Sequence, residues 1–346
     1  MNNKHKILTF GVALMLAAGV SSCNDDWSEE QYSHYISFKA PLDTEGTSVG
    51  VTTVYIPFTR SGEDGQPLYG ENGLSHYDLP VIVAGSTVNP ADVTVNIVHS
   101  DTLTNLNLER FSENRKAIWY NDMSDYATYP SSITIPAGQD IALLRVKFDF
   151  RNLDLADKYV LPLTIDDPMR NPLKHFATAM LRVLPYTTYS GQYMATNLKY
   201  YIVSGGVVDN EPGAMNTVQL YATDEDEAFF YAGTFSEDNE LRKHFKIYAK
   251  FIPFEEGGTR GTVRLYTDQE DMNFIENDVA TFNILETPDE VQSYIVRKTV
   301  IISGIDYTFS DTYSAPGSSI DYKVTGTMTM ERKLNTQKPE EDQIEF

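Results

Sequence analysis

The sequence is poor in the side chains that usually build metal centres and covalent cross-links. It has one cysteine, Cys23, among 346 residues, so no disulfide can form within the chain and no multi-cysteine metal site is available. Histidine is scarce as well, and no two histidines stand at a ligand spacing. Beyond the N-terminal segment they are His34, His76, His99, His175 and His244. Stability must therefore come from ordinary hydrophobic cores, and the chain is long enough for two of them.

Basic side chains are outnumbered by acidic ones. The chain carries 27 lysines and arginines against 49 aspartates and glutamates, a formal net charge of −22. A surface this acidic repels phosphate backbones and anionic headgroups, which argues against nucleic acid as a partner. Solubility outside the cell is the simplest interpretation of the charge, which by itself identifies no ligand.

Recognisable catalytic motifs are also missing. The sequence contains no Gly-x-Ser-x-Gly elbow, no His-Glu-x-x-His pair and no glycine-rich phosphate loop. Carboxylates are too abundant for any two to stand out as a glycosidase pair. The acidic run Asp224–Glu227 lacks the spaced aspartates and turn glycine of a calcium loop, which favours a solvated turn. We therefore expect a protein that is not an enzyme and uses no cofactor or metal.

The N-terminus has the pattern of a secretory leader. Two lysines precede the apolar run Ile7–Val20, which is too short to span a bilayer with its flanks. Val20 to Cys23 then places an aliphatic and two small residues before the cysteine, the order of a lipobox. We expect a lipoprotein signal peptide over 1–22, acylation of Cys23 and an acidic tether over 23–31, with the mature chain held on a membrane by its acyl chains.

From Tyr32 onward the chain reads as short strands. Runs rich in Val, Ile, Tyr and Phe alternate with Gly, Pro, Asn and Asp. The first group of candidate strands covers 32–39, 51–59, 78–84, 93–99, 133–135, 141–150, 159–165 and 177–184. Seven or eight strands over about 150 residues predict an immunoglobulin-like β-sandwich for 32–185, with one short helix or long loop over 101–116.

A second group of strands follows a boundary at 185–186. It covers 192–203, 218–222, 229–234, 245–251, 262–267, 280–285, 294–302 and 320–331. Eight strands in meander order predict either an antiparallel, lipocalin-like β-barrel or a second sandwich for 186–332. The polar residues 333–346 have no period and predict a flexible tail. The expected fold class is all-β.

Several of these segments resemble one family. The sequence is similar to surface lipoproteins from polysaccharide-utilisation loci of the Bacteroidetes. The similar segments are the lipobox with Asn24-Asp25-Asp26, the runs Ile133–Gly138 and Tyr159–Ile165, and Tyr189–Tyr193 at the start of the second half. In that group an N-terminal β-sandwich module of unknown function precedes a second β-rich module. The resemblance implies an outer-membrane lipoprotein facing the cell exterior. It also implies capture of oligosaccharides or polysaccharides for a porin-type glycan importer with a lipoprotein lid.

One segment has the composition of a glycan platform. Residues 117–130 crowd aromatic rings among polar side chains without strand alternation. The candidate glycan-binding residues are Trp119, Tyr120, Asn121, Asp122, Asp125, Tyr126 and Tyr129. Rings stack on the C–H faces of sugars while carboxylates and amides bind their hydroxyls. The other interpretation is a loop pinned to the sandwich by its own aromatics, and both remain open.

Three functions are compatible with these observations. The first is non-catalytic glycan capture at the cell surface. The second is a structural or accessory subunit of an outer-membrane transport or adhesion assembly, to which a tether and two β-modules are equally suited. The third is a glycoside hydrolase without a recognisable motif. An exposed aromatic row with neighbouring amides would favour the first, and a flat apolar patch the second.

Overall fold

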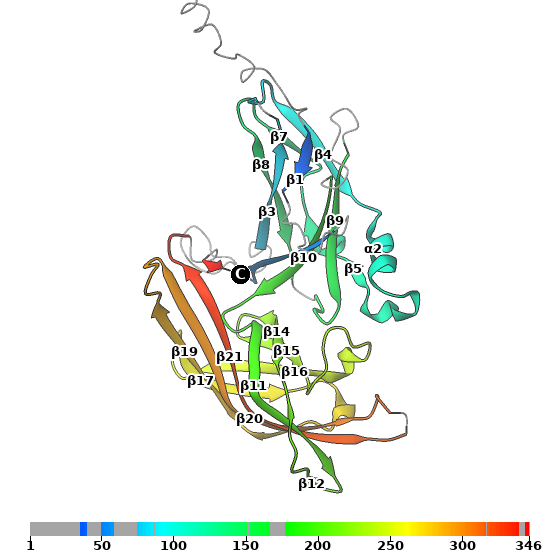
Figure 1. Cartoon of the computed structure of the whole chain (residues 1–346), viewed down its shortest axis with the longest axis vertical. Helices are drawn as coiled ribbons and strands as arrows, with labels where there is room; N and C mark the ends of the chain where they lie inside the picture. The colour runs from blue at the N-terminus through cyan, green and yellow to red at the C-terminus, as the bar shows by residue number, and fades with distance from the viewer. Residues whose placement is uncertain are drawn as a thin grey trace, which may run out of the picture.

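The protein consists of two β-modules joined end to end (Figure 1). The computed structural model describes residues 35–39, 50–58, 75–85, 87–150, 153–166, 177–315, 317–338 and 343–345. The expected signal peptide, tether and Cys23 lie outside these residues. Within them, no helix has the length and apolarity needed to cross a membrane.

The first module is a sandwich of two sheets. One has the order β1 (Ile36–Phe38), β3 (Ser75–Val83), β8 (Ile141–Phe148) and β6 (Ala127–Thr128). The other has the order β2 (Val51–Pro57), β10 (Thr178–Tyr186), β9 (Lys158–Ile165), β4 (Val93–His99) and β7 (Ser132–Ile135), with β5 (Tyr120–Asp122) on β9. Alternate residues of these strands point inward, and Leu79, Val95 and Leu163 are fully buried between the sheets. β2 lies at one edge, parallel to β10.

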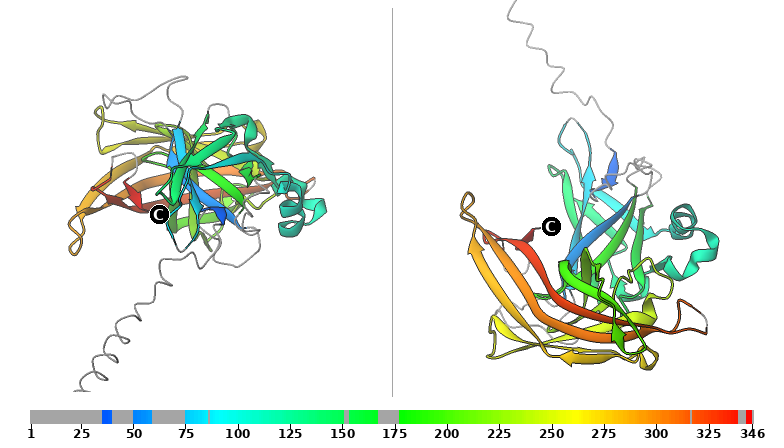
Figure 2. Two further views of the ribbon diagram at one scale, coloured as in Figure 1. Left: turned by 90° about the horizontal axis from the view of Figure 1, so that it is seen from above. Right: turned by 60° about the horizontal axis from the view of Figure 1, so that its bottom comes forward.

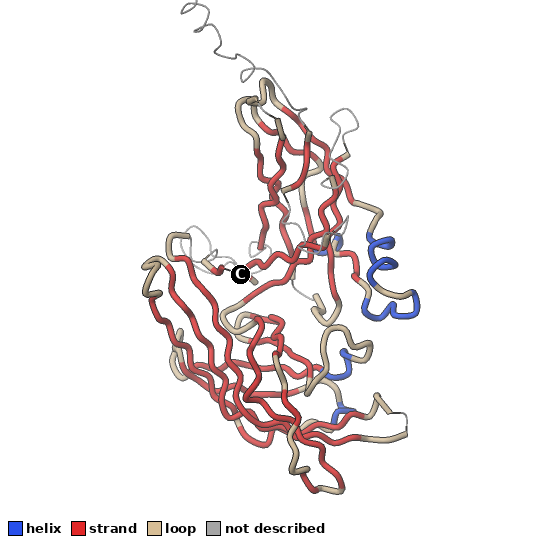
Figure 3. Tube along the Cα trace, in the orientation of Figure 1, coloured by secondary structure: helices blue, strands red, loops and turns tan. Residues whose placement is uncertain are grey.

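The short helix or long loop expected over 101–116 is the start of a largely helical excursion from the sandwich that extends to residue 126. The excursion contains α2 (Leu103–Arg110), η3 (Glu113–Ile118) and η4 (Ser124–Tyr126), and Figure 3 shows how little other helix the molecule contains. The buried Asn107 secures the excursion: its amide donates to the Tyr120 carbonyl at 2.9 Å and accepts from the Tyr120 N–H at 2.8 Å. One side chain thus satisfies two buried backbone groups that no strand reaches.

The second module is a closed barrel. Its strands, in hydrogen-bonded order, are β11 (Gly191–Ser204), β14 (Thr217–Asp224), β15 (Glu227–Tyr231), β16 (Lys246–Pro253), β17 (Arg260–Tyr266), β19 (Ala280–Pro288), β20 (Ile295–Asp311) and β21 (Ile320–Asn335). Pairing of β21 with β11 closes the ring. Figure 2 shows the long, curled β20 and β21 beneath the sandwich. The shorter elements are β12 (Val207–Val208), β13 (Gly213–Ala214), β18 (Ile275–Asp278), β22 (Ile344–Glu345), η5 (Arg242–Phe245) and η6 (Glu270–Met272).

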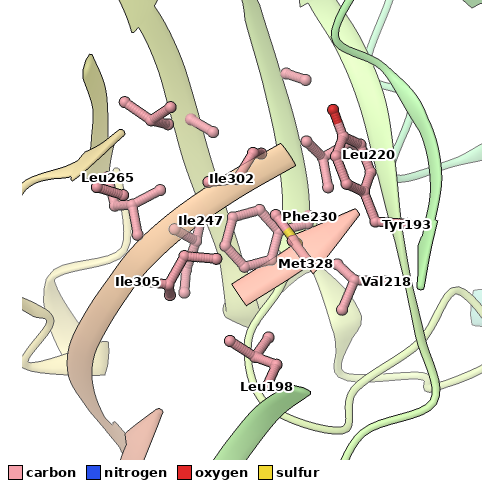
Figure 4. Packing of buried hydrophobic residues seen from close by; sticks show 14 of the residues in the cluster. Tyr193, Leu198, Val218, Leu220, Phe230, Ile247, Leu265, Ile302, Ile305 and Met328 are labelled. Carbon is pink, nitrogen blue, oxygen red and sulfur yellow. The ribbon is translucent and has the colours of Figure 1, made fainter. Parts of the chain in front are cut away.

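Side chains fill the barrel. Tyr193 and Phe230 are at most 1 % exposed, and Ile302 and Met328 pack with them (Figure 4). Tyr307 belongs to the same core and is fully buried. The all-β prediction is confirmed, and of the two alternatives for the second module the structure has the barrel. Lipocalin-like barrels can hold a ligand inside, but the interior of this barrel is filled by side chains, so a binding site must lie outside it.

The expected tail needs correction. β21 continues to Asn335, and β22 returns to pair with it, placing Glu345 opposite Lys333 and Ile344 opposite Leu334. Within this segment, residues 333–335 and 344–345 therefore belong to paired strands. The segment is polar because a short edge strand needs backbone pairing more than a hydrophobic face.

Candidate functional site

A short, hydrogen-bonded turn connects the two modules. Between β10 and β11 the Thr187 N–H donates to Ser190 Oγ at 2.8 Å, and the Ser190 N–H donates to Thr187 Oγ1 at 3.3 Å. The Tyr193 hydroxyl donates to the Tyr189 carbonyl at 2.8 Å, and Arg332 Nη1 donates to the Thr187 carbonyl at 2.6 Å. Side chains of the barrel thus hold the turn on which the relative position of the modules depends.

A barrel loop over residues 236–242 reaches into the sandwich. Its Arg242 is 1 % exposed. The guanidinium donates from Nε to the Ala156 carbonyl at 2.6 Å and from Nη1 to the Ala117 carbonyl at 2.8 Å. Nη2 lies 3.6 Å from an Asp157 carboxylate oxygen. A buried arginine is stable when carbonyls and a carboxylate surround it in this way, so the contact joins the modules firmly.

The same loop carries a second ionic cluster. Glu237 accepts two hydrogen bonds from Arg182 of β10, at 3.1 and 2.5 Å, and one from the Tyr221 hydroxyl at 2.8 Å. The Lys158 ammonium nitrogen lies 3.9 Å from a carboxylate oxygen of Glu237. Burial alone would raise the pKa of Glu237, but the hydrogen bonds and charge of Arg182, together with Lys158, hold it below its usual value. The Glu237 carboxylate therefore stays ionised at neutral pH.

Beside this cluster the two modules enclose an open cleft with a cavity of about 490 Å³. The sandwich wall carries Thr53 and Tyr55, and Tyr55 is 39 % exposed. The barrel wall carries three side-chain amides: Gln192, Asn216 and Gln219. An amide both donates and accepts hydrogen bonds, and a phenol ring offers an apolar face. The lining suits a small molecule with C–H faces and hydroxyl edges.

A second cavity, of about 440 Å³, adjoins the first. The two share the residues Tyr55, Leu184, Gln192, Gln219 and Tyr221. The second extends toward the end of β21, where Met330 and Arg332 line it. Together the cavities form a groove, here called the junction cleft, to which both modules contribute walls.

The residues expected to form an aromatic platform are divided between two cores and the surface. Tyr120 is 8 % exposed and packs edge-to-face on Phe111 at 5.4 Å, in a small core under α2. Trp119 is half-buried, with Lys116 Nζ over its ring at 5.4 Å. Tyr120 therefore offers little ring surface to a ligand, whereas part of the Trp119 ring is accessible.

The remaining members lie around the sandwich edge. Tyr126 is half-buried edge-to-face on Tyr159 at 5.6 Å, and Tyr129 packs against the sandwich core. Asp122 is exposed and lies 2.5 Å from Nε2 of His99. Burial opposes ionisation of Asp122, but Ser124 and His99 hold its pKa below the usual value. This part of the surface also carries the exposed Asn121 and Asp125. The segment's role in binding stays a prediction.

Aromatic residues of the second module have several environments. Phe230, Tyr307 and Phe309 are buried in the barrel core. On the outside of the barrel, Tyr221, Phe229, Tyr248 and Tyr266 follow one another across β14 to β17 in register. Their neighbouring centroids are 5.0, 6.2 and 5.2 Å apart. Leu155 and Ala156 of the sandwich pack on the Tyr221 end of this row, whereas Tyr266 at the other end is 42 % exposed.

The acidic run considered for calcium is part of a hairpin turn. Asp226 forms an ion pair with Lys250 at 2.5 Å, and Asp224 accepts from the N–H of Glu225 at 2.8 Å. Across the described ranges no group of three or more histidines, aspartates or glutamates is arranged to hold a metal ion. Nothing in this turn points to a cation.

A packed, closed barrel fixed to an immunoglobulin-like sandwich, with a cleft at their junction, defines a class of two-module β proteins. One family model, described as a domain of unknown function (DUF4973), matches residues 27–169. A second, whose description reads only "-like, C-terminal", matches residues 177–329. The boundary between the two matches falls between β9 and β10, so the second match includes β10, the last strand of the sandwich, together with the barrel strands. A comparison with curated proteins gave no match.

Solved structures from Bacteroides share the whole arrangement. An auxiliary nutrient binding protein from Bacteroides thetaiotaomicron is 37 % identical, with a TM-score of 0.78 over 91 % of this chain and 100 % of that one. A multidomain protein including DUF1735 from Bacteroides ovatus is also 37 % identical, with a TM-score of 0.75 over 90 % and 100 %. A Bacteroides ovatus protein of unknown function is 28 % identical, with a TM-score of 0.72 over 92 % and 97 %. The chain belongs to this family of two-module Bacteroides proteins, and the resemblance drawn from its sequence is confirmed.

Proposed function

We propose that this protein is a lipid-anchored accessory protein of the cell envelope that captures oligosaccharides in the junction cleft without cleaving them. The observation that carries the proposal is the cleft itself, in which an exposed tyrosine from one module faces side-chain amides from the other. Its volume of about 490 Å³ falls in the usual range for small-molecule sites.

The chemistry of the lining supports a carbohydrate ligand. The ring of Tyr55 can cover the C–H face of a sugar, while Gln192 and Gln219 bind its hydroxyls. The turn and the loop 236–242 hold the two walls in place, so little conformational freedom is lost on binding. The related protein named an auxiliary nutrient binding protein has the same two modules, which also supports capture of a nutrient.

The N-terminal sequence supports the place of action. A lipobox ending in Cys23 and the acidic Asn24-Asp25-Asp26 behind it favour an acylated protein on the outer membrane, facing outward. There the captured glycan would be passed to a porin-type importer with its lipoprotein lid. The acidic surface keeps the body soluble at the membrane.

The test is a glycan-array screen of the soluble body, residues 27–346, followed by affinity gels for any polysaccharide that scores. We expect a selective hit that Tyr55→Ala weakens at least tenfold and that Trp119→Ala and Tyr126→Ala leave unchanged. The two latter variants are matched aromatic truncations from the alternative segment 117–130. The same glycans, incubated with protein, should release no new reducing ends.

Each other outcome has a definite meaning. Loss of the hit in Trp119→Ala or Tyr126→Ala, with Tyr55→Ala unaffected, would move the site to the excursion. Reducing ends above background would make the protein a hydrolase. A blank array with well-folded protein would overturn glycan capture and favour a subunit of a transport or adhesion assembly.

A further inference from the structure

Arg332 is a buried cation that forms no ion pair with any carboxylate among the described residues. It is 8 % exposed at the end of β21. Among the described residues its guanidinium makes one hydrogen bond, from Nη1 to the Thr187 carbonyl at 2.6 Å, and no ion pair with a carboxylate. The guanidinium has five N–H donors, so most of its hydrogen-bonding capacity is left for other partners. Burial lowers its pKa, although arginine stays charged at any physiological pH.

The position of Arg332 is set by the strand. Met328, Met330 and Arg332 alternate on the face of β21 that points into the barrel. The two methionines pack in the core, whereas Arg332 lies one step further, at the rim facing the sandwich. There it reaches the ring of Tyr186, with the guanidinium carbon 5.8 Å from the ring centroid.

The unfilled space around Arg332 is extensive. It lines the cavity of about 440 Å³ in the junction cleft, together with Tyr55 and Gln192. It also lines a cavity of about 490 Å³ on its other side, beside Tyr186 and Lys298. A guanidinium therefore separates two hollows, within reach of a molecule in the cleft.

Neighbouring acids are engaged elsewhere. Glu331 lies 3.8 Å from Arg297, and Glu286 lies 3.6 Å from Lys298. The phenol groups of Tyr55, Tyr186 and Tyr193 also interact electrostatically with Arg332. Glu225, Glu286 and Glu331 line the same cavities as Arg332, yet none of them forms an ion pair with it. A buried arginine without such a partner is unusual.

Holding the turn uses only one of the five N–H donors of Arg332. A lysine or an amide could reach the Thr187 carbonyl without burying a planar, permanent charge. We propose that Arg332 binds the carboxylate of an acidic sugar in the junction cleft, so that the captured oligosaccharide contains uronic acid. This inference rests on the proposed glycan-binding function. The fork of a guanidinium matches the two oxygens of a carboxylate, and the nearby Tyr55 and Gln192 serve the rest of the ring.

The overall negative charge does not prevent such binding. At physiological ionic strength the Debye length is about 8 Å, so distant surface carboxylates are largely screened. A buried guanidinium close to the ligand is screened much less. The arrangement accepts a single carboxylate at one place while the surface repels polyanions in general.

The test compares each acidic oligosaccharide with its own neutral ester. Trimers of galacturonate and of mannuronate and a glucuronate-containing trimer, with their methyl esters, are titrated by calorimetry at 0.15 M salt. Proteins are the soluble body and its Arg332→Gln, Arg332→Lys and Arg264→Gln variants. Arg264 is the matched control, since it is an exposed barrel arginine paired with Glu276 at 2.7 Å and does not line the cleft.

We expect at least one acidic trimer to bind the parent protein roughly 10- to 100-fold more tightly than its ester, the worth of charge-assisted hydrogen bonds. Arg332→Gln should remove that preference, Arg332→Lys should reduce it, and Arg264→Gln should leave it intact. If Arg332→Gln does not fold, as judged by circular dichroism, Arg332→Lys provides the test. Its ratio of acid affinity to ester affinity should then be lower than that of the parent protein.

Two results would overturn the inference. Equal binding of acids and esters, or a preference that survives both Arg332 variants, would leave Arg332 with the turn alone, while glycan capture would stand. Binding of neutral array glycans but of no uronide would have the same meaning. If no glycan of either kind binds, the proposed function fails, and the acidic-sugar site fails with it.

Discussion

Replacing Arg242 with methionine tests whether one side chain holds the two modules together. The guanidinium donates to two sandwich carbonyls, at 2.6 and 2.8 Å, and lies 3.6 Å from Asp157. Methionine preserves much of the apolar stem but leaves both carbonyls without their donor, and the Ala156 carbonyl belongs to a residue that is only 1 % exposed. Hydrogen bonds to a charged group contribute about 1.5–3 kcal/mol each, and water has little access to the Ala156 carbonyl to replace the lost bond. We expect Arg242→Met to lower the free energy of unfolding by about 3–5 kcal/mol.

The assay uses a fluorophore that the sandwich itself supplies. Trp119 lies two residues beyond Ala117, whose carbonyl accepts from Arg242. In a Trp27→Phe background, Trp119 fluorescence follows the sandwich during urea unfolding, while far-ultraviolet circular dichroism follows both modules. In the parent the two signals should change together, as expected for a cooperative unit. In Arg242→Met the fluorescence transition should shift to lower urea and separate from the dichroism.

The control is a second arginine replaced by the same residue. The Arg264 side chain is 56 % exposed and paired with Glu276, so Arg264→Met should cost less than about 1 kcal/mol. If Arg242→Met also changed stability by less than 1 kcal/mol and left the two transitions coincident, the argument that this arginine fixes the junction would be refuted.

Three further outcomes follow from other parts of the molecule. The pKa of Glu237 in the folded protein lies below its value in the unfolded chain, so its contribution to the free energy of unfolding is complete above about pH 5 and is lost as the pH falls through the folded pKa. The urea midpoint of Glu237→Gln should therefore be lower than that of the parent at pH 7, and the two midpoints should converge toward pH 3. A parallel pair of pH curves would contradict this. Gly326 has φ 141°, and a Cβ there would lie 2.1 Å from the Asn197 carbonyl oxygen, so Gly326→Ala should cost at least about 3 kcal/mol or abolish folding. The control is Gly206→Ala in an open turn, which should cost only about 1–2 kcal/mol. Equal soluble yields of the Gly326→Ala and Gly206→Ala proteins would argue against closure of the barrel by β21 and β11. Cys23→Ala should abolish labelling by radioactive fatty acid and release the protein from the membrane fraction; labelling that persists would remove the lipobox assignment.

Much of the strand pattern could be predicted because alternation is a local property. In β21, Val324, Met328 and Met330 lie at alternating positions of the strand predicted over 320–331, and all three are buried. The same alternation places Arg332 on the same face. A charged residue in a row of core-facing positions is the sequence signal that indicates a buried cation. The pattern alone does not place Arg332 in the core, because alternation does not locate the end of a strand.

Other features had no local signal. The aromatic crowding of 117–130 was visible in the sequence, but whether each ring faces a core or solvent depends on the strands beneath it. Tyr120 points into a small core because Asn107, thirteen positions earlier, holds its backbone. Tyr55 showed no local sign of a site, since the residues that face it lie in another module.

The sequence by itself determined the class of fold, the succession of two β-modules and the acidic, cysteine-poor character of the chain, because composition and period are properties of neighbouring residues. Tertiary structure alone decided that β21 closes on β11, that Arg242 and Glu237 join the modules, and that Tyr55, Gln192 and Arg332 share one cleft. These relations connect residues far apart along the chain. Only the packing of one module against the other brings them within a few ångströms.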